Sequence, residues 1–172
     1  MQLETPTLAD AESISEVAES TFISTFAHLY PPEDLTAFLK EWMPPAKVRA
    51  QIEDEAFDYR IVRGQSGNVA GYIKIGPIDF DLPAGEQVEG ATELHQLYVH
   101  PELHGSGAAG HLIDWALNES RTQGFERIYL SVFIENVRAQ RFYKKYGFYE
   151  VGKNAFHVGN TIDDDRIWRC DL

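Results

Sequence analysis

The strongest constraint in this sequence is a strand that runs into a glycine-rich turn and then a helix, within residues 91–124. Residues 93–99 are typical of a strand, and the turn Gly105–Gly110 follows a short connection that contains Pro101. Glycines let the backbone approach a ligand closely, and a helix start offers unpaired N–H groups with a partial positive charge. Behind the turn, apolar residues recur at helical spacing, with Gly124 placed to end the helix; they are Ala109, Leu112, Ile113, Ala116 and Leu117. The stretch therefore predicts a site for phosphate or pyrophosphate.

Two classes of ligand fit this turn, and the first is a dinucleotide. Gly105-Ser106-Gly107-Ala108-Ala109-Gly110 is a literal G-x-G-x-x-G, and Glu135 lies at a suitable distance for an acid that binds a ribose. However, residues 100–104 separate the strand from the first glycine, whereas a dinucleotide turn follows its strand directly. The strand also carries Glu93 and His95, although a central parallel strand is normally apolar throughout. These two features argue against a dinucleotide.

The second ligand is acetyl-coenzyme A, because the same stretch resembles the cofactor loop of the GNAT N-acetyltransferases. Val99-His100-Pro101 followed by His104-Gly105-Ser106-Gly107-Ala108-Ala109 is similar to the family's V-x-P and Q/R-x-x-G-x-G/A patterns. His104 stands where the family usually has arginine or glutamine. The resemblance therefore implies a pyrophosphate contact that depends mainly on backbone N–H groups.

A second block, residues 136–148, favours the GNAT interpretation. Its sequence, Asn136-Val137-Arg138-Ala139-Gln140-Arg141-Phe142-Tyr143-Lys144-Lys145-Tyr146-Gly147-Phe148, is similar to the family pattern N-x-x-A-x-x-F/L-Y-x-x-x-G-F. The same residues predict a helix, since Asn136 can cap its start and Gly147 can end it. A small side chain at Ala139 lets a ligand pack closely on that helix. Two blocks in the right order identify the chain as a member of the GNAT family.

Composition and charge restrict the remaining function classes. A chain of 172 residues with 44% apolar residues predicts one domain over residues 1–172. The single cysteine, Cys170, excludes an internal disulfide and indicates a reducing, cytoplasmic location. Neither a signal peptide nor a membrane span is expected. The net charge of −12, from 15 basic and 27 acidic residues, argues against nucleic acid and anionic membranes as partners and favours a cationic substrate.

The other patterns predict an α/β (α+β) fold with a mixed central sheet of about seven strands flanked by helices. Short alternating runs and turn residues place the strands, and proline and aspartate mark helix starts. The expected strands are 2–6, 58–63, 69–75, 93–99, 127–133, 148–156 and 165–172, and the expected additional helices begin at Asp10, Asp34 and Pro44-Pro45. Residues 77–90 form an acidic loop. The GNAT resemblance implies that the sheet splays between its central strands and that coenzyme A lies in the gap.

The resemblance also assigns roles to individual residues. The pantetheine arm would pair with the backbone of Leu97, Tyr98 and Val99. Tyr143 matches the tyrosine often proposed as general acid toward the leaving sulfur. Further cofactor contacts are implied for His104, Gly105, Ser106, Gly107, Ala108, Ala109, Asn136, Ala139, Phe142 and Lys145.

The general base has two candidates on one strand. Glu93 matches a position where the family often has a glutamate that acts directly or through water. His95 lies two residues further on and faces the same way, and an imidazole titrates near neutrality without help. A reaction with no dedicated base stays open as well. The spacing of His95, His100, His104 and His111 matches no metal-ligand pattern, so no metal is expected.

For the acceptor, short segments resemble the bacterial spermidine/spermine acetyltransferase branch. They are residues 21–28, 93–99 and 156–159, with Asp164-Asp165. The resemblance implies a polyamine or another small cationic amine as substrate, and it allows a homodimer as well as a monomer. The alternative function is a GNAT-like sensor that binds acetyl-coenzyme A without turnover.

Overall fold

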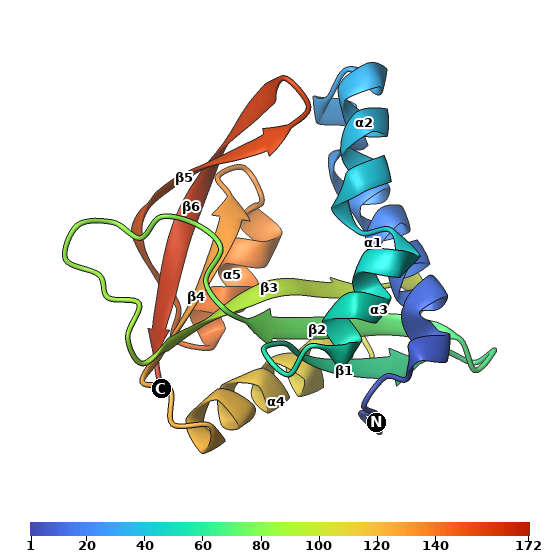
Figure 1. The fold of residues 1–172 in the computed structure, drawn as a ribbon, viewed down its shortest axis with the longest axis horizontal. Coiled ribbons are helices and arrows are strands. Elements are labelled where there is room, and N and C mark those ends of the chain that lie inside the picture. Colours follow the sequence, from blue (N-terminus) through green and yellow to red (C-terminus); the bar gives the residue numbers. More distant parts are fainter.

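A computed structural model describes residues 1–172 and shows a twisted mixed sheet with helices on both faces (Figure 1). The strand order is β1-β2-β3-β4-β6-β5. The strands are β1 (Asp58–Arg63), β2 (Val69–Gly76), β3 (Ala91–Val99), β4 (Arg127–Phe133), β5 (Tyr149–Val158) and β6 (Thr161–Asp171). The α-helices are α1 (Ala11–Phe26), α2 (Pro32–Trp42), α3 (Pro45–Glu53), α4 (Ala108–Thr122) and α5 (Val137–Lys145). The predicted mixed α/β fold is confirmed.

The predicted seventh strand, over residues 2–6, is reduced to a single bridge, so the expectation of about seven strands was one too high. Glu4 and Ile61 exchange both backbone hydrogen bonds, at 3.0 and 2.9 Å. The next donor along an antiparallel ladder would be two residues further on, at Pro6, which has no N–H group. Thr7 then starts a short helical turn, and the ladder cannot continue.

The two central strands splay apart, as the family resemblance implies. β3 and β4 run parallel but pair only over residues 91–93 and 127–129. Beyond Glu93 and Tyr129 the two strands diverge, which Figure 1 shows clearly. β3 keeps its antiparallel pairing with β2, and β4 keeps its pairing with β6, so the gap lies between two intact half-sheets. Every other strand pair is antiparallel, which does not match the parallel sheet of a dinucleotide-binding domain.

Helices cover both faces of the sheet. α4 and α5 cover one face, and the core beneath them draws on strands of both half-sheets. α4 contributes Leu112, Ile113, Ala116 and Leu117 to this core, as its periodicity predicts. Ala108 is buried there in place of the predicted Ala109, which is only partly buried because it lines the cleft. α1 and α3 cover the other face over β1 and β2. The predicted apolar face of α1 is buried, and it consists of Ile14, Val17, Ala18 and Phe22. None of the helices combines the length and the apolar character needed to cross a bilayer.

The N-terminal helices are tied to the C-terminal hairpin. α2 begins at Pro32, two residues before the predicted start, because proline fits the first helical position. Asp34 accepts hydrogen bonds from the side chains of Asn160 and Thr161, at 3.1 and 3.0 Å. The predicted turn at Gly159-Asn160 is present and short, so β5 and β6 extend closer to it than expected. This contact holds α2 over the end of the hairpin.

Candidate active site

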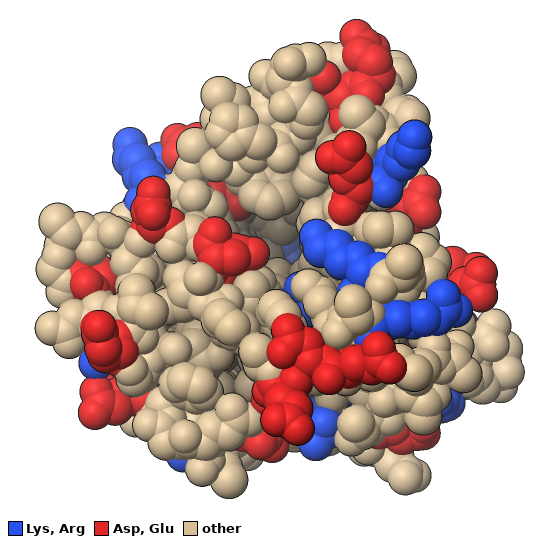
Figure 2. Space-filling view, in the orientation of Figure 1, with Lys and Arg blue, Asp and Glu red and all other residues tan.

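The gap between β3 and β4 opens into a cleft with a volume of about 1380 Å³. Figure 2 shows it as a hollow near the middle of the visible face, with acidic and basic side chains around its rim. β3, β4, β6, α1, α5 and the glycine turn before α4 all contribute lining residues. Most residues that sequence reasoning singled out line this one cleft: Glu93, Leu97, Tyr98, Val99, His104, Gly105, Gly107, Ala108, Ala109, Asn136, Ala139, Phe142, Tyr143 and Lys145.

The glycine turn offers open backbone at the start of α4. Gly105 and Gly107 have φ values of 78° and 86°, in the left-handed region that glycine adopts without strain. A Cβ atom at either position would meet nothing within 4 Å, so the space beside the turn is free for a ligand. The first-turn amides of Ala109 and Gly110 have no intrahelical acceptor. The turn can therefore bind an anionic group through N–H donors.

The side chains of His104 and Ser106 both contact nearby backbone carbonyl oxygens. The Nε2 atom of His104 lies 3.2 Å from the carbonyl oxygen of Val99, although the residue lines the cleft. Ser106 does not line the cleft, because its hydroxyl donates to the carbonyl of Leu103 at 2.6 Å. Its backbone N–H donates to the same carbonyl, at 3.1 Å. Ser106 thus shapes the turn and has no free backbone donor for a cofactor.

Tyr143 projects from α5 into the cleft, half-buried and next to aromatic rings. Its ring centroid lies 5.5 Å from that of Phe142 and 5.6 Å from that of Phe148. Burial raises the pKa of Tyr143 above its ordinary value, so the hydroxyl stays protonated at neutral pH. As predicted, Asn136 caps the helix, and its Oδ1 atom accepts from the N–H of Ala139 at 3.1 Å. A protonated hydroxyl in a buried setting can serve as a proton donor.

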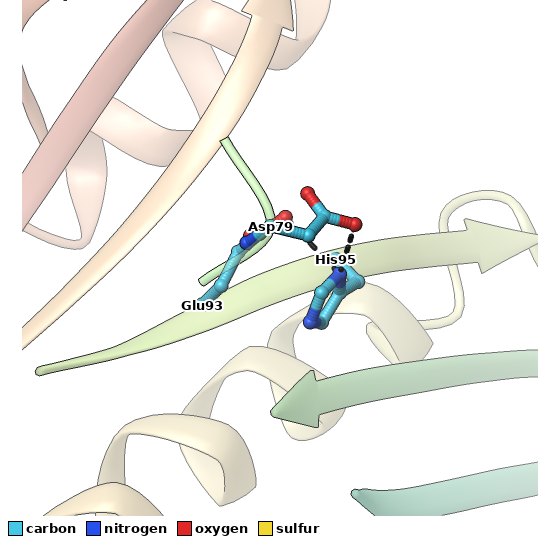
Figure 3. Close-up of side chains that lie close together, drawn as sticks. All are labelled: Asp79, Glu93 and His95. Carbon is cyan, nitrogen blue, oxygen red and sulfur yellow. Dashed lines mark hydrogen bonds and ion pairs between the residues drawn. The ribbon is translucent and has the colours of Figure 1, made fainter. Parts of the chain in front are cut away.

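Glu93 and His95 lie side by side as predicted, and a third group, Asp79, joins them (Figure 3). The Nδ1 atom of His95 is 3.1 Å from Glu93 Oε1 and 3.5 Å from Asp79 Oδ2. The backbone N–H of Asp79 donates to Glu93 Oε2 at 2.9 Å. The pairing of β2 with β3 has a bulge at His95, and both Glu93 and His95 line the cleft. Sequence reasoning missed Asp79, whose only signal was its place in the acidic loop.

The pKa values of Glu93 and His95 are both shifted, by burial and by the contacts within the cluster. Burial raises the pKa of Glu93, which is only 5% exposed. Burial alone would lower the pKa of His95, but hydrogen bonds and charge from Asp79 and Glu93 outweigh it and raise the value. The neighbouring Lys74 is buried too, and this burial lowers its pKa to about 8. The ligand atoms of Asp79, Glu93 and His95 lie within 4.8 Å of one another, close enough to share a proton or to surround a small cation.

A second group of acids lines the cleft from β6. Asp163 and Asp165 are 9% and 7% exposed, and both face the cleft. Asp164 lies between them and points to the opposite face, where it pairs with Arg166 at 2.9 Å. Burial raises the pKa of Asp165 to about 6. Of the sequence-predicted pair Asp164-Asp165, only the second member reaches the cleft, and sequence reasoning missed Asp163.

The acidic loop contributes less to the cleft than its composition predicts. Glu86 is held by Arg169 at 2.9 Å and by the hydroxyl of Tyr129 at 2.5 Å. Asp79 is the acidic residue of loop 77–90 that lines the cleft.

Comparison with known proteins decides between the possible ligands of the glycine turn. Residues 16–148 match the model of the acetyltransferase (GNAT) family. The chain belongs to this family. GNAT members transfer an acetyl group from acetyl-coenzyme A, so the chain is an acetyl-coenzyme A-dependent N-acetyltransferase, and the dinucleotide alternative is wrong.

Relatives and solved structures agree with the GNAT assignment. An uncharacterized N-acetyltransferase of Mycobacterium tuberculosis is 29% identical over 165 residues, covering 96% of this chain and 99% of the relative. The spermidine N(1)-acetyltransferase of Vibrio cholerae is 31% identical over 116 residues, 66% of this chain and 62% of the relative. The fold is similar to that of the PaiA N-acetyltransferase of Thermoplasma acidophilum in complex with coenzyme A, with a TM-score of 0.77 and 19% identity over 99% of this chain and 98% of that one.

Proposed function

We propose that this GNAT enzyme acetylates a primary amine of a small cationic acceptor, with polyamines as the first candidates. The observation that carries the proposal is that one cleft combines two different halves. One half has the glycine turn and the unpaired edge of β3, which suit the cofactor. The other half has buried carboxylates on β3 and β6, which suit a cation.

The residues of the cofactor half fit acetyl-coenzyme A. When bound, this cosubstrate supplies the acetyl group as an activated thioester. Backbone N–H groups at Gly107, Ala109 and Gly110 are suited to the pyrophosphate. The free edge of β3 at residues 97–99 is suited to amide groups of the pantetheine arm, and the exposed Lys145 to the 3′-phosphate. Ala139 and Phe142 offer an apolar surface on α5 for the rest of the arm.

In this mechanism Glu93 is the general base and Tyr143 the general acid. The ammonium group of the acceptor must lose a proton before its nitrogen can attack, and Glu93 receives that proton directly or through water. His95 and Asp79 hold the carboxylate in place, and His95 is the second candidate for the base. The hydroxyl of Tyr143 donates its proton to the departing sulfur.

Three observations support a cationic acceptor. The chain carries a net charge of −12. The carboxylates of Asp163 and Asp165 face the cleft, where a positive group can approach them. In addition, the relative from Vibrio cholerae is named as a spermidine acetyltransferase, which makes spermidine a reasonable first substrate. The single cysteine is a free thiol, which supports our proposal of a cytoplasmic location.

Turnover with a panel of amines tests the proposed function. We expect release of coenzyme A with spermidine or short diamines, and weaker activity on neutral or acidic amines. If acetyl-coenzyme A binds but no amine is acetylated, the chain is a sensor and the proposed function is wrong. Calorimetry with NADH serves as the control, and we expect acetyl-coenzyme A to bind more tightly.

A further inference from the structure

We propose that Asp163 and Asp165 form a subsite for a second ammonium group of the acceptor, and that this subsite makes the enzyme select diamines over monoamines. The two residues occupy alternate positions on β6, so both carboxylates face the same side of the strand, toward the cleft. The inference rests on the proposed function, because it names the part of the acceptor that this wall of the cleft recognises.

Neither carboxylate has a cationic partner within the protein. Arg166, the nearest arginine along β6, pairs with Asp164 and Glu150 on the opposite face. Both cleft carboxylates are more than nine-tenths buried, at 9% and 7% exposure. A buried charge without a partner of opposite sign is unfavourable, and a cation bound from solution removes that penalty.

The hydrogen bonds around the two acids leave ligand positions open. Asp163 accepts from the hydroxyl of Tyr30, and Asp165 accepts from the hydroxyl of Ser131 at 2.9 Å. In both cases the acceptor is the Oδ2 atom, so the Oδ1 atom of each buried carboxylate has no hydrogen-bond donor. Asn154 donates to Ser131 at 3.1 Å and thereby directs the serine proton toward Asp165. The two Oδ1 atoms are therefore available to a donor on the ligand.

Aromatic rings surround this part of the cleft. Phe22 and Tyr30 stack with centroids 6.0 Å apart, and Phe26 meets Phe133 edge to face at 6.3 Å. These rings line the cleft together with Phe156. Aromatic faces attract ammonium groups and pack well against methylene chains. A short alkyl chain with a terminal ammonium group matches both the walls and the acids.

The acids of β6 suit a group that stays charged during the reaction. The amine that reacts must become neutral, whereas a pair of carboxylates stabilises the protonated form and opposes its loss of a proton. Glu93 lies on β3, and β4 separates that strand from β6 in the sheet. An acceptor with two amino groups can place one near Glu93 and Tyr143 and keep the other as ammonium at the acids of β6.

The test compares a diamine with a monoamine of similar length in the variant Asp165→Asn. At a pH above the pKa of Asp165, about 6, we expect kcat/KM for 1,4-diaminobutane to fall roughly 10- to 100-fold, and that for butylamine to change less than about threefold. Asp164→Asn is the matched control, because it removes an acid from the same strand on the opposite face. We expect it to leave both values near those of the wild type.

Two kinetic outcomes would overturn the subsite. If kcat/KM falls equally for the diamine and the monoamine, Asp165 acts on the reacting amine and not on a second ammonium group. If neither value changes, Asp165 takes no part in recognising the acceptor. If Asp165→Asn fails to fold in a thermal melt, Asp163→Asn takes its place in the same comparison.

Binding without turnover separates this inference from the proposed function. We expect 1,4-diaminobutane to bind the coenzyme A-saturated enzyme, as measured by calorimetry, and to bind Asp165→Asn at least about tenfold more weakly. If no amine is acetylated but this difference persists, the proposed function fails and the subsite stands. If polyamines are acetylated and binding does not depend on either acid, the subsite is wrong and the proposed function stands.

Discussion

The hydroxyl of Tyr143 forms no hydrogen bond within the protein, although its ring packs between Phe142 and Phe148. Tyr143→Phe keeps the ring, so we expect little change in melting temperature. Loss of the proton donor should lower kcat toward the low end of the ~10²–10⁴-fold range of general acid catalysis, because a thiolate leaves fairly well unaided. The KM for acetyl-coenzyme A should stay nearly constant in steady-state kinetics.

Tyr149→Phe is the control for this change, because its hydroxyl contacts Asp171 and Arg169 and it does not line the cleft. A drop in kcat of less than about threefold in Tyr143→Phe, with an unchanged alkaline limb of the pH profile, would leave Tyr143 with a packing role alone.

The pH dependence of the reaction depends on the contact between His95 and Glu93. A base must be ionised to act, and hydrogen bonding and charge from His95 lower the pKa of Glu93 against the effect of burial. His95→Asn removes that counteracting effect, so the pKa of Glu93 should rise further. We therefore expect the acidic limb of the pH profile of kcat/KM to move to higher pH. The exposed His111→Asn is the control and should not move it, and a limb that stays in place in His95→Asn would contradict the role of Glu93.

Local patterns predicted the residues of the site that share a strand or a helix with a motif. Glu93 and His95 were expected to be neighbours because alternate residues of a strand face one side. Asp79 and Asp163 could not be predicted, because their places in the cleft depend on a loop and on the pairing of β6 with β4. Such contacts are set by tertiary packing and leave no signal in local spacing.

The turn before α4 provides a matched pair of glycine variants. Gly107 and Gly67 have φ values of 86° and 83°, and a Cβ atom at either meets nothing within 4 Å. A valine at each should lower the free energy of unfolding by a similar amount, roughly 1–2 kcal/mol, because both must adopt left-handed backbone. Gly107→Val alone should abolish binding of acetyl-coenzyme A in calorimetry, since it adds a side chain where the ligand meets the backbone.

Gly67 lies in the hairpin between β1 and β2, outside the cleft, so Gly67→Val should keep its affinity for acetyl-coenzyme A. A folded Gly107→Val with unchanged affinity would exclude the turn from the cofactor site.

Elements with strong local signals were predicted within a few residues. α4 and α5 end where glycines at 124 and 147 adopt φ values of 85° and 87°. Errors arose where one residue changes the backbone hydrogen bonding. Pro6 stops the predicted first strand, and Pro32 starts α2 earlier than Asp34 would. Both outcomes follow from the missing N–H group of proline. The prolines are visible in the sequence, but the spacing of apolar residues does not report a missing backbone donor.

Across the whole molecule, distant parts of the chain build the two halves of the cleft. The middle of the chain, from β3 to α5, carries the two sequence blocks and lines the half of the cleft that we propose for the cofactor. In the acceptor half, Tyr30 in the connection between α1 and α2 contacts Asp163, and Asp34 of α2 contacts Thr161, so both are joined to the C-terminal hairpin. These contacts connect residues more than 100 positions apart, so sequence spacing could not predict them.

A substitution of Asp34 should weaken the packing of the acceptor half without changing a residue that lines the cleft. Hydrogen bonds from the backbone of Asn160, and from the side chains of Thr161 and Asn160, lower the pKa of this carboxyl. A lowered pKa in the folded state stabilises the protein above the ordinary aspartate value, and that stabilisation is lost as the pH falls through the folded value. Asp34→Asn should therefore lower the melting temperature at neutral pH, and the difference from wild type should shrink in acid.

The same variant should separate the two substrates kinetically. Because Asp34 holds α2 over the hairpin that carries Asp163, its loss lets the aromatic wall of the acceptor half move. We expect a higher KM for the amine and a smaller change in the KM for acetyl-coenzyme A, whose half of the cleft meets α2 where Trp42 packs edge to face on Tyr98, with ring centroids 5.9 Å apart. Glu33→Gln, an exposed change on the same helix, is the control and should alter neither value. Equal increases in both KM values in Asp34→Asn would show instead that the two halves of the cleft move as one body.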